Sequence, residues 1–201
     1  HIFVAIICCS LGASKLAQGN PVEGLKYHKR SQKILKRHPK ENPTFFATLH
    51  NNLGDVYMVL GNPKRAARHF EEALDINLEL FGKNHPNTSK YMSNRALAWI
   101  GLGKTYSVVE SLEEALTIET SCSGNDHPKV SSLLNNLGLA SYHFGNIKQA
   151  CSYFERAYQL SLKVRGDSHP TTLKMACSLG KVLADSGRVK DGLKLCEGAV
   201  E

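Results

Sequence analysis

Apolar side chains recur along this chain at spacings of three and four residues, which is the pattern of one face of an α-helix. In residues 44–60 that face carries Leu49, Leu53 and Tyr57, and a second series of the same kind follows in residues 63–81. The pattern continues through the chain. It predicts ten helices, near residues 2–17, 21–37, 44–60, 63–81, 87–102, 104–121, 129–144, 146–165, 171–186 and 188–200.

The same pattern returns every 42 residues, and an internal period of this length is the mark of a repeat protein. A glycine between the two helices of each pair recurs at every step, as Gly19, Gly61, Gly103, Gly145 and Gly187. We therefore expect about five helical hairpins. The predicted repeats span approximately 1–38, 43–82, 86–124, 128–166 and 170–201. Together they are expected to form a single repeat domain over residues 1–201, and the start at His1 suggests a fragment of a longer chain.

Two columns of the repeat predict how the helices pack. Small residues fill one column and are expected to let the two helices of a hairpin approach closely: Gly54, Ala96, Gly138 and Gly180. Larger residues fill the other and are expected to occupy the space between neighbouring hairpins: Tyr57, Trp99, Phe70 and Phe154. Stacked hairpins of this kind give an all-α fold, an α-solenoid in which each repeat contacts mainly its neighbours.

The turns between helices carry recognisable end signals. Glycine followed by asparagine ends one helix in a conformation with positive φ, and Asn20 and Asn62 then stand at N-cap positions before a proline. His-Pro pairs at 85–86, 127–128 and 169–170 open the odd-numbered helices in the same way. Stacking would separate these histidines by ~10 Å, which is too far for one metal ion. We predict turn and cap roles for them and no metal site.

Composition adds a few limits to this picture. The chain has 201 residues, of which 42% are hydrophobic, and it has a formal net charge of +7. No apolar stretch reaches the ~18 residues that a membrane helix requires, so we expect no membrane span. The six cysteines form no CxxC pair, and several stand where the repeat expects a small apolar residue. This usage fits a reducing compartment and predicts a cytoplasmic protein.

The residues at this point resemble a known family. The series L-G-x-x-Y, then G-N or G-K, then A-x-x-x-F-x-x-A is similar to the tetratricopeptide repeat over nearly all of the chain. The 42-residue period, N-N-L-G in the first helix and the closing G-x-x-H-P resemble the kinesin light chain and nephrocystin-3 subgroup. The resemblance implies a right-handed superhelix whose first helices line a concave groove that binds peptides.

Helical geometry gives candidates for such a groove without reference to the family. Steps of 100° per residue place one set of side chains away from the packing face: Thr48, Asn51, Asn52, Asp55, Lys90, Asn94, Leu97, Asn135, Asn136, Leu139, His143, Lys174 and Lys181. Asn52, Asn94 and Asn136 lie one repeat apart. An amide supplies both donors and an acceptor, so this ladder is suited to the backbone of an extended peptide. The alternative is that these asparagines cap or bridge to the adjacent helix.

The kinesin light chain resemblance implies an acidic peptide, with Lys90, Lys174 and Lys181 contacting its carboxylates. The favoured function is therefore a non-catalytic scaffold for a protein or peptide ligand, without a cofactor, because no nucleophile elbow or phosphate loop is present. One alternative is a regulatory or self-association module of a larger signalling protein. A weaker alternative is nucleic-acid binding through the basic helix of residues 26–40. A solvated outer face is the simpler interpretation of that helix.

Overall fold

The computed structural model describes residues 2–37, 41–104 and 106–198. Over these residues it is all α-helix, without a strand, and the predicted helix ends agree to within a few residues. The ten helices are α1 (Ile2–Ala17), α2 (Pro21–Leu35), α3 (Pro43–Val59), α4 (Pro63–Phe81), α5 (Pro86–Ile100), α6 (Tyr106–Ser123), α7 (Pro128–His143), α8 (Ile147–Arg165), α9 (Pro170–Asp185) and α10 (Val189–Glu197).

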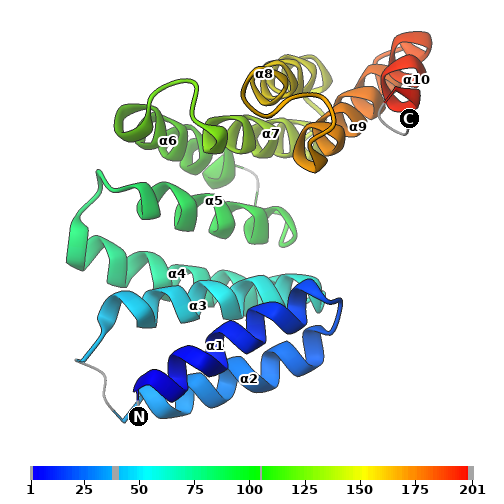
Figure 1. The fold of residues 1–201 in the computed structure, drawn as a ribbon. Helices are drawn as coiled ribbons and strands as arrows, with labels where there is room; N and C mark the ends of the chain where they lie inside the picture. The colour runs from blue at the N-terminus through cyan, green and yellow to red at the C-terminus, as the bar shows by residue number, and fades with distance from the viewer. Residues whose placement is uncertain (1, 38–40, 105, 199–201) are drawn as a thin grey trace. The chain divides into compact units, whose positions relative to one another are not determined.

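The helices divide between two compact bodies, residues 1–103 and residues 104–201. In the N-terminal body α1 pairs with α2 and α3 with α4, and α5 packs against α4 (Figure 1). In the C-terminal body α7 pairs with α8 and α9 with α10, while α6 packs against α7. Each body thus contains stacked antiparallel hairpins of the predicted solenoid type. The boundary falls inside the third predicted repeat, and the single domain over 1–201 stays a prediction.

A glycine of the first helix faces a large side chain of the second helix in these hairpins. A Cβ atom added to Gly54 would overlap the ring of Phe70, and one added to Gly138 would come within 2.8 Å of the Phe154 ring. The small column therefore allows close approach, as predicted. The prediction for Phe70 was incomplete, because its ring fills the space inside its own hairpin as well as contacting the core shared with α5.

The first hairpin contains the same arrangement with a histidine in place of the aromatic ring. A Cβ atom on Gly12 would lie 2.7 Å from Cε1 of His28, and the His28 side chain is fully buried. Neither of its ring nitrogens has a hydrogen-bond partner within the described part of the chain. Burial lowers the pKa of His28 to about 4, because the charged imidazolium would lose its hydration there. His28 is thus a neutral imidazole that fills the space beside Gly12, as the aromatic rings do in the two hairpins described above.

Helix ends follow the predicted turn chemistry with one exception. Gly61 has a φ of 68°, in the left-handed region, and the Asn62 side chain accepts a hydrogen bond from the backbone N–H of Arg65 at 3.1 Å. Asn20 stands at the predicted N-cap position of α2, before a proline, but its side chain makes no cap hydrogen bond. The histidines of the three His-Pro pairs do cap their helices through Nδ1, which confirms their structural role: His85, His127 and His169.

Buried polar contacts tie one hairpin to the next helix. In the N-terminal body Asn77 of α4 donates to the Thr88 hydroxyl of α5 at 2.7 Å, and Thr88 donates to the Gly82 carbonyl at 3.1 Å. In the C-terminal body the hydroxyls of Ser161 and Thr172 make the equivalent contact at 2.8 Å. These pairs satisfy polar groups that would otherwise be unpaired in the core, and they fix how successive helices meet.

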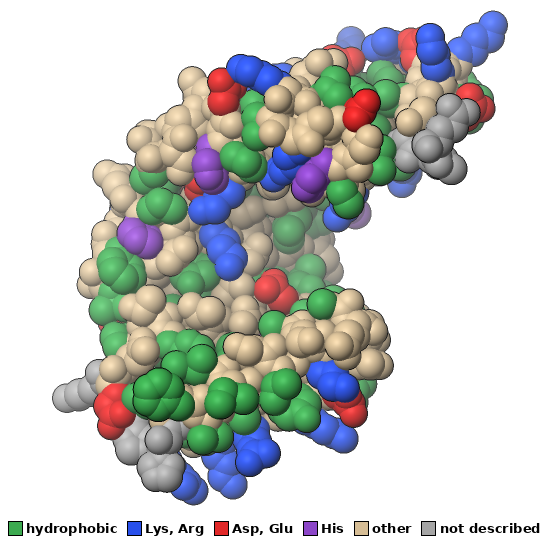
Figure 2. All heavy atoms as spheres, viewed as in Figure 1, with side chains coloured by type: hydrophobic (Ala, Val, Ile, Leu, Met, Phe, Trp, Pro, Cys, Tyr) green, Lys and Arg blue, Asp and Glu red, His purple; other side chains and the backbone are tan. Residues whose placement is uncertain are grey.

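Helix α1 presents an apolar face to solvent. Phe3, Ile7 and Leu11 are 80%, 57% and 43% exposed, and Figure 2 shows hydrophobic side chains gathered over this helix. One repeat later the same columns hold Leu49 and Leu53, which are buried against the first hairpin. The exposed face of α1 is therefore the stacking face of the repeat. None of the described helices is long and apolar enough to cross a membrane.

Candidate peptide-binding surface

Side-chain amides on α3 and α5 form a connected cluster in the N-terminal body. Asn94 donates from Nδ2 to Oδ1 of Asn51 at 2.8 Å, and Asn51 donates from Nδ2 to Oδ2 of Asp55 at 3.1 Å. Asn51 is buried, whereas Asn94 and Asp55 are half-buried. The pairs come together because successive first helices lie side by side with a shift of one repeat. The cluster therefore has a fixed, buried base and a partly exposed rim.

The rim also contains a carboxyl group with an altered pKa. Burial raises the pKa of Asp55 to about 6, while the nearby positive charge of Lys90 and the hydrogen bond from Asn51 act in the opposite direction. Lys90 is exposed, and its Nζ lies 5.9 Å from the centre of the Tyr91 ring. Thr48 hydrogen bonds with the Tyr91 side chain. This rim carries both signs of charge near neutral pH.

Several predicted surface residues are less accessible than the helical geometry indicated. Asn51 and Asn135 are 1% and 7% exposed, so their predicted position away from the packing face is wrong. In the N-terminal body α3 packs against both α1 and α5, so its flanks are covered by neighbouring first helices, which a single helix cannot reveal. Asn52 is half-buried and donates to Sγ of Cys9 at 3.3 Å. Asn52 and Asn94 thus each hydrogen bond to an adjacent helix, which is the alternative role stated above for these asparagines.

A second group of the predicted residues lies together in the C-terminal body. Nζ of Lys181 stands 5.0 Å from the centre of the Tyr142 ring, and the Tyr142 hydroxyl donates to Asp185 at 2.7 Å. The ring of His143 lies edge-on to Tyr142, with the centroids 6.4 Å apart. Lys174 is exposed on the same helix as Lys181, two turns earlier. α9 therefore offers one lysine beside an anchored aromatic ring of α7 and a second exposed lysine two turns away.

The remaining candidates of this body serve packing in part. Asn136 is half-buried, and Leu139 contacts the apolar core formed by α8 and α9. Leu97, in the same column of the N-terminal body, is also half-buried. Oδ1 of the buried Asn135 has no hydrogen-bond partner among the described residues. A buried amide oxygen without a hydrogen-bond partner carries the free-energy cost of its lost hydration.

The basic run on α2 is exposed. This agrees with a solvated outer face, and all six of its members are solvent-accessible: Lys26, Lys29, Arg30, Lys33, Lys36 and Arg37. The predicted basic helix also included residues 38–40, which lie outside the described residues. Nucleic-acid binding by this face stays a prediction.

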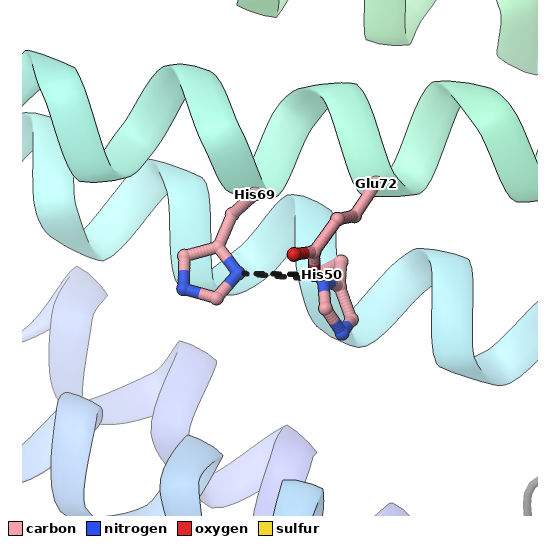
Figure 3. A group of neighbouring side chains, drawn as sticks. All are labelled: His50, His69 and Glu72. Atoms are coloured by element: carbon pink, nitrogen blue, oxygen red, sulfur yellow. Dashed lines mark hydrogen bonds and ion pairs between the residues drawn. The ribbon is translucent and has the colours of Figure 1, made fainter.

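One cluster of functional groups was not predicted from the sequence. His50 of α3 meets His69 and Glu72 of α4, and these three side chains form the one described group whose geometry suits a metal ion (Figure 3). They line a cavity of about 480 Å³ together with side chains of α2, α3 and α4 that include Lys36 and Arg68. The spacing of His69 and Glu72 by three residues was the available signal. Its partner 19 residues earlier could be assigned only after the hairpin was built.

Comparison with known families decides the kind of protein. The model of the tetratricopeptide repeat matches residues 45–121 and 129–195, which is more than half of the chain. The chain belongs to the tetratricopeptide repeat family. Repeats of this family are in general non-catalytic scaffolds for protein interaction. No curated protein matches the sequence.

Solved structures of other tetratricopeptide repeat proteins are similar in fold. The nearly identical repeats of a kinesin light chain candidate from Podosopora anserina match with a TM-score of 0.77 and 18% identity, covering 99% of this chain and 94% of that one. A Rap protein complexed with Competence and Sporulation Factor gives a TM-score of 0.83 at 16% identity, covering 98% of this chain and 55% of the Rap chain.

A second Rap protein, the conjugation gene regulator of the plasmid pLS20 in complex with the Phr* peptide, gives a TM-score of 0.80 at 18% identity. It covers 94% of this chain, which spans 50% of that protein. These identities establish the fold alone. The similarity to kinesin light chain repeats agrees with the resemblance found in the sequence.

Proposed function

We propose that this tetratricopeptide repeat chain is a non-catalytic scaffold that binds an extended, acidic peptide along the first helices of its hairpins. The observation that carries the proposal is the amide cluster of α3 and α5. Asn94 is held by Asn51 at 2.8 Å, so its half-exposed amide is already oriented. A side chain that is fixed before binding loses less conformational entropy when a ligand arrives. Two solved relatives by fold are complexes with peptide or factor ligands.

Exposed lysines in each of the two bodies support an acidic ligand. Lys90 is exposed at the rim of the amide cluster, and Lys174 and Lys181 are exposed on α9. Asp55 opposes such a ligand when it is ionised. Its raised pKa of about 6 lets it take up a proton in mildly acidic solution, which removes that repulsion. We therefore expect tighter binding of acidic peptides at pH 5.5 than at pH 7.5.

Fluorescence anisotropy with a panel of labelled acidic peptides tests the surface. We expect Asn94→Ala combined with Asn136→Ala to weaken binding by at least about fivefold, because two amide hydrogen bonds are lost. The matched control is Asn84→Ala combined with Asn125→Ala, which removes two amides from exposed loops. Unchanged affinity in the first variant, or an equal loss in the control, would refute the proposal.

Substitution of lysines tests the charge of the ligand separately. Lys90→Ala should weaken binding of an acidic peptide by about two- to fivefold at low salt, and less at high salt, since exposed charge pairs are screened. Lys29→Ala on α2 removes the same charge from the basic run and should have no such effect. An equal effect of both substitutions would mean that net charge, rather than this surface, attracts the peptide.

A second candidate function is self-association through α1. The exposed Ile7 and Leu11 occupy columns that are buried one repeat later, and the column of Phe3 is half-buried there, so a second copy of the chain fits this face. Sedimentation velocity should show association that Ile7→Glu abolishes. A strict monomer at high concentration would exclude it.

The six cysteines are free thiols, and Cys122 and Cys177 are exposed, which supports a reducing, cytoplasmic location.

A further inference from the structure

His50, His69 and Glu72 direct three ligand atoms at one point between α3 and α4. Nδ1 of His50 lies 3.3 Å from Nδ1 of His69 and 2.5 Å from Oε2 of Glu72. The third side of this triangle, from Nδ1 of His69 to Oε2 of Glu72, is 3.9 Å. Figure 3 shows the rings of His69 and His50 approaching from facing helices, with the Glu72 carboxylate beside them.

Hydrogen bonding satisfies these three atoms in one arrangement of protons. If Nδ1 of His50 carries the proton, it donates to Oε2 of Glu72 and also faces the lone pair of Nδ1 of His69. If Nδ1 of His69 also carries a proton, two N–H groups face each other at 3.3 Å. The other ring nitrogen of His50 is buried and has no hydrogen-bond partner in the described chain, and the His50 side chain is 4% exposed. A cation between the three atoms would engage all three lone pairs at once.

The distances suit a transition-metal ion of the zinc type. Bonds of ~2.0–2.1 Å in a tetrahedral site place the ligand atoms about 3.3–3.4 Å apart. The separation of the two Nδ1 atoms is already 3.3 Å. Glu72 must move away from His50 by somewhat less than ~1 Å to complete that geometry. Its side chain is 38% exposed, so this adjustment meets little packing resistance.

A histidine binds a metal ion through the lone pair of a neutral ring nitrogen. Ligation through Nδ1 of His50 and Nδ1 of His69 therefore requires each ring to carry its proton on Nε2.

Nearby positive charges limit which ion can bind. Lys36, Arg65 and Arg68 border the cavity, and Nε of Arg68 donates to Oε1 of Glu72 at 3.3 Å. This positive field opposes any cation that is held mainly by charge. Magnesium and calcium prefer several oxygen ligands and find one carboxylate here. Imidazole nitrogen favours zinc, copper and nickel instead.

We propose that Nδ1 of His50, Nδ1 of His69 and a carboxylate oxygen of Glu72 bind one divalent ion of the zinc class between α3 and α4. Three protein ligands leave a fourth position, which faces the cavity of about 480 Å³ and would take a water molecule. Because both ligand-bearing helices belong to one hairpin, the bound ion would clamp α3 to α4. The proposal does not depend on peptide binding by the other surface.

Isothermal titration of the full, tag-free chain with Zn²⁺ tests the site, with Co²⁺ as a coloured substitute. All proteins in this experiment carry Cys122→Ser and Cys177→Ser, since exposed thiols also bind zinc. We expect one ion per chain, visible Co²⁺ absorption of the tetrahedral kind and an increase in melting temperature with Zn²⁺. Mg²⁺ should give none of these effects.

Ligand substitutions complete the test. His69→Ala and Glu72→Gln should each lower zinc affinity at least tenfold and abolish the increase in melting temperature, because each removes one of three ligands. Glu71→Gln is the matched control on the same helix and should leave affinity unchanged. Circular dichroism confirms that each variant is folded. Zinc binding that is absent, or equal in Glu72→Gln and Glu71→Gln, would overturn the proposal.

Discussion

The buried His28 provides a measurable link between a single side chain and the stability of the fold. In the equivalent column the second and fourth repeats carry Phe70 and Phe154, each over a glycine. Substitution of His28 by phenylalanine therefore repeats a solution that the chain already uses. It removes two buried nitrogens that have no hydrogen-bond partner in the described chain. At pH 7.5 we expect His28→Phe to raise the free energy of unfolding by about 1–3 kcal/mol.

The pH dependence of this effect can be worked out from the pKa. The pKa of His28 is about 4 in the folded protein and 6.5 for the free side chain. As the pH falls below 6.5 the unfolded chain takes up a proton that the folded chain excludes, so stability is lost down to about pH 4. For one such group the loss between pH 7.5 and pH 5 is about 2 kcal/mol. The phenylalanine variant lacks this loss, so its advantage should grow by that amount at pH 5.

Urea denaturation followed by circular dichroism at both pH values measures the two differences. All other histidines are shared by the two proteins, so their contributions cancel in the comparison. His143→Phe is the control, since His143 is exposed and its substitution should not give the gain at pH 7.5. An equal advantage at pH 7.5 and pH 5 would show that the folded protein protonates His28 freely. A loss of stability at pH 7.5 would show that the imidazole has a partner.

Three further sets of substitutions have defined outcomes in the same denaturation assay. Gly54→Ala should cost about 1–2 kcal/mol of stability because its Cβ overlaps the Phe70 ring, despite the better helix propensity of alanine. Adding Phe70→Leu should recover part of that loss. Additive effects of the two substitutions would contradict the packing argument. Asn62→Ala should cost about 1 kcal/mol and Asn20→Ala almost nothing, since Asn62 alone of the two makes a cap bond. Asp55→Asn should stabilise by about 3 kcal/mol at pH 7.5 and by only about 0.5 kcal/mol at pH 4, because a carboxyl pKa raised from 3.8 to about 6 makes ionisation of the folded protein costly as the pH rises through that range. A gain that is independent of pH would refute this.

The sequence was sufficient for the fold because each repeat restates the same local rules. Helix ends follow from glycine at positive φ and from proline at the first helical position, and these are properties of two or three adjacent residues. The glycine column was informative for the same reason, since close approach of two helices within one hairpin requires it. Asn20 shows the limit of such rules. It has the capping residue type and position, yet its side chain does not accept the bond.

The candidate surface was predicted less completely because it depends on neighbouring helices. Asn51 lies on the correct helix but is buried by α5, and its amide is used in the contact with Asn94. A single helical projection has no information on that neighbour. The group of His50, His69 and Glu72 was missed for a related reason. His50 and His69 are 19 positions apart in the sequence and on different helices, and only the pairing of α3 with α4 brings them together. Contacts between elements, rather than periodicity, decide both cases.

The hydrogen bonds between successive first helices have a consequence for synthesis of the protein. Asn52 reaches back to Cys9, Asn94 to Asn51, and Asp185 is bound by Tyr142, so each bond spans 43 positions. Each newly made hairpin can therefore dock on the one that left the ribosome just before it. In repeat proteins each unit contacts mainly its neighbours, and domains generally fold as units during translation. The body formed by residues 1–103 can reach its native structure while the rest of the chain is still being translated.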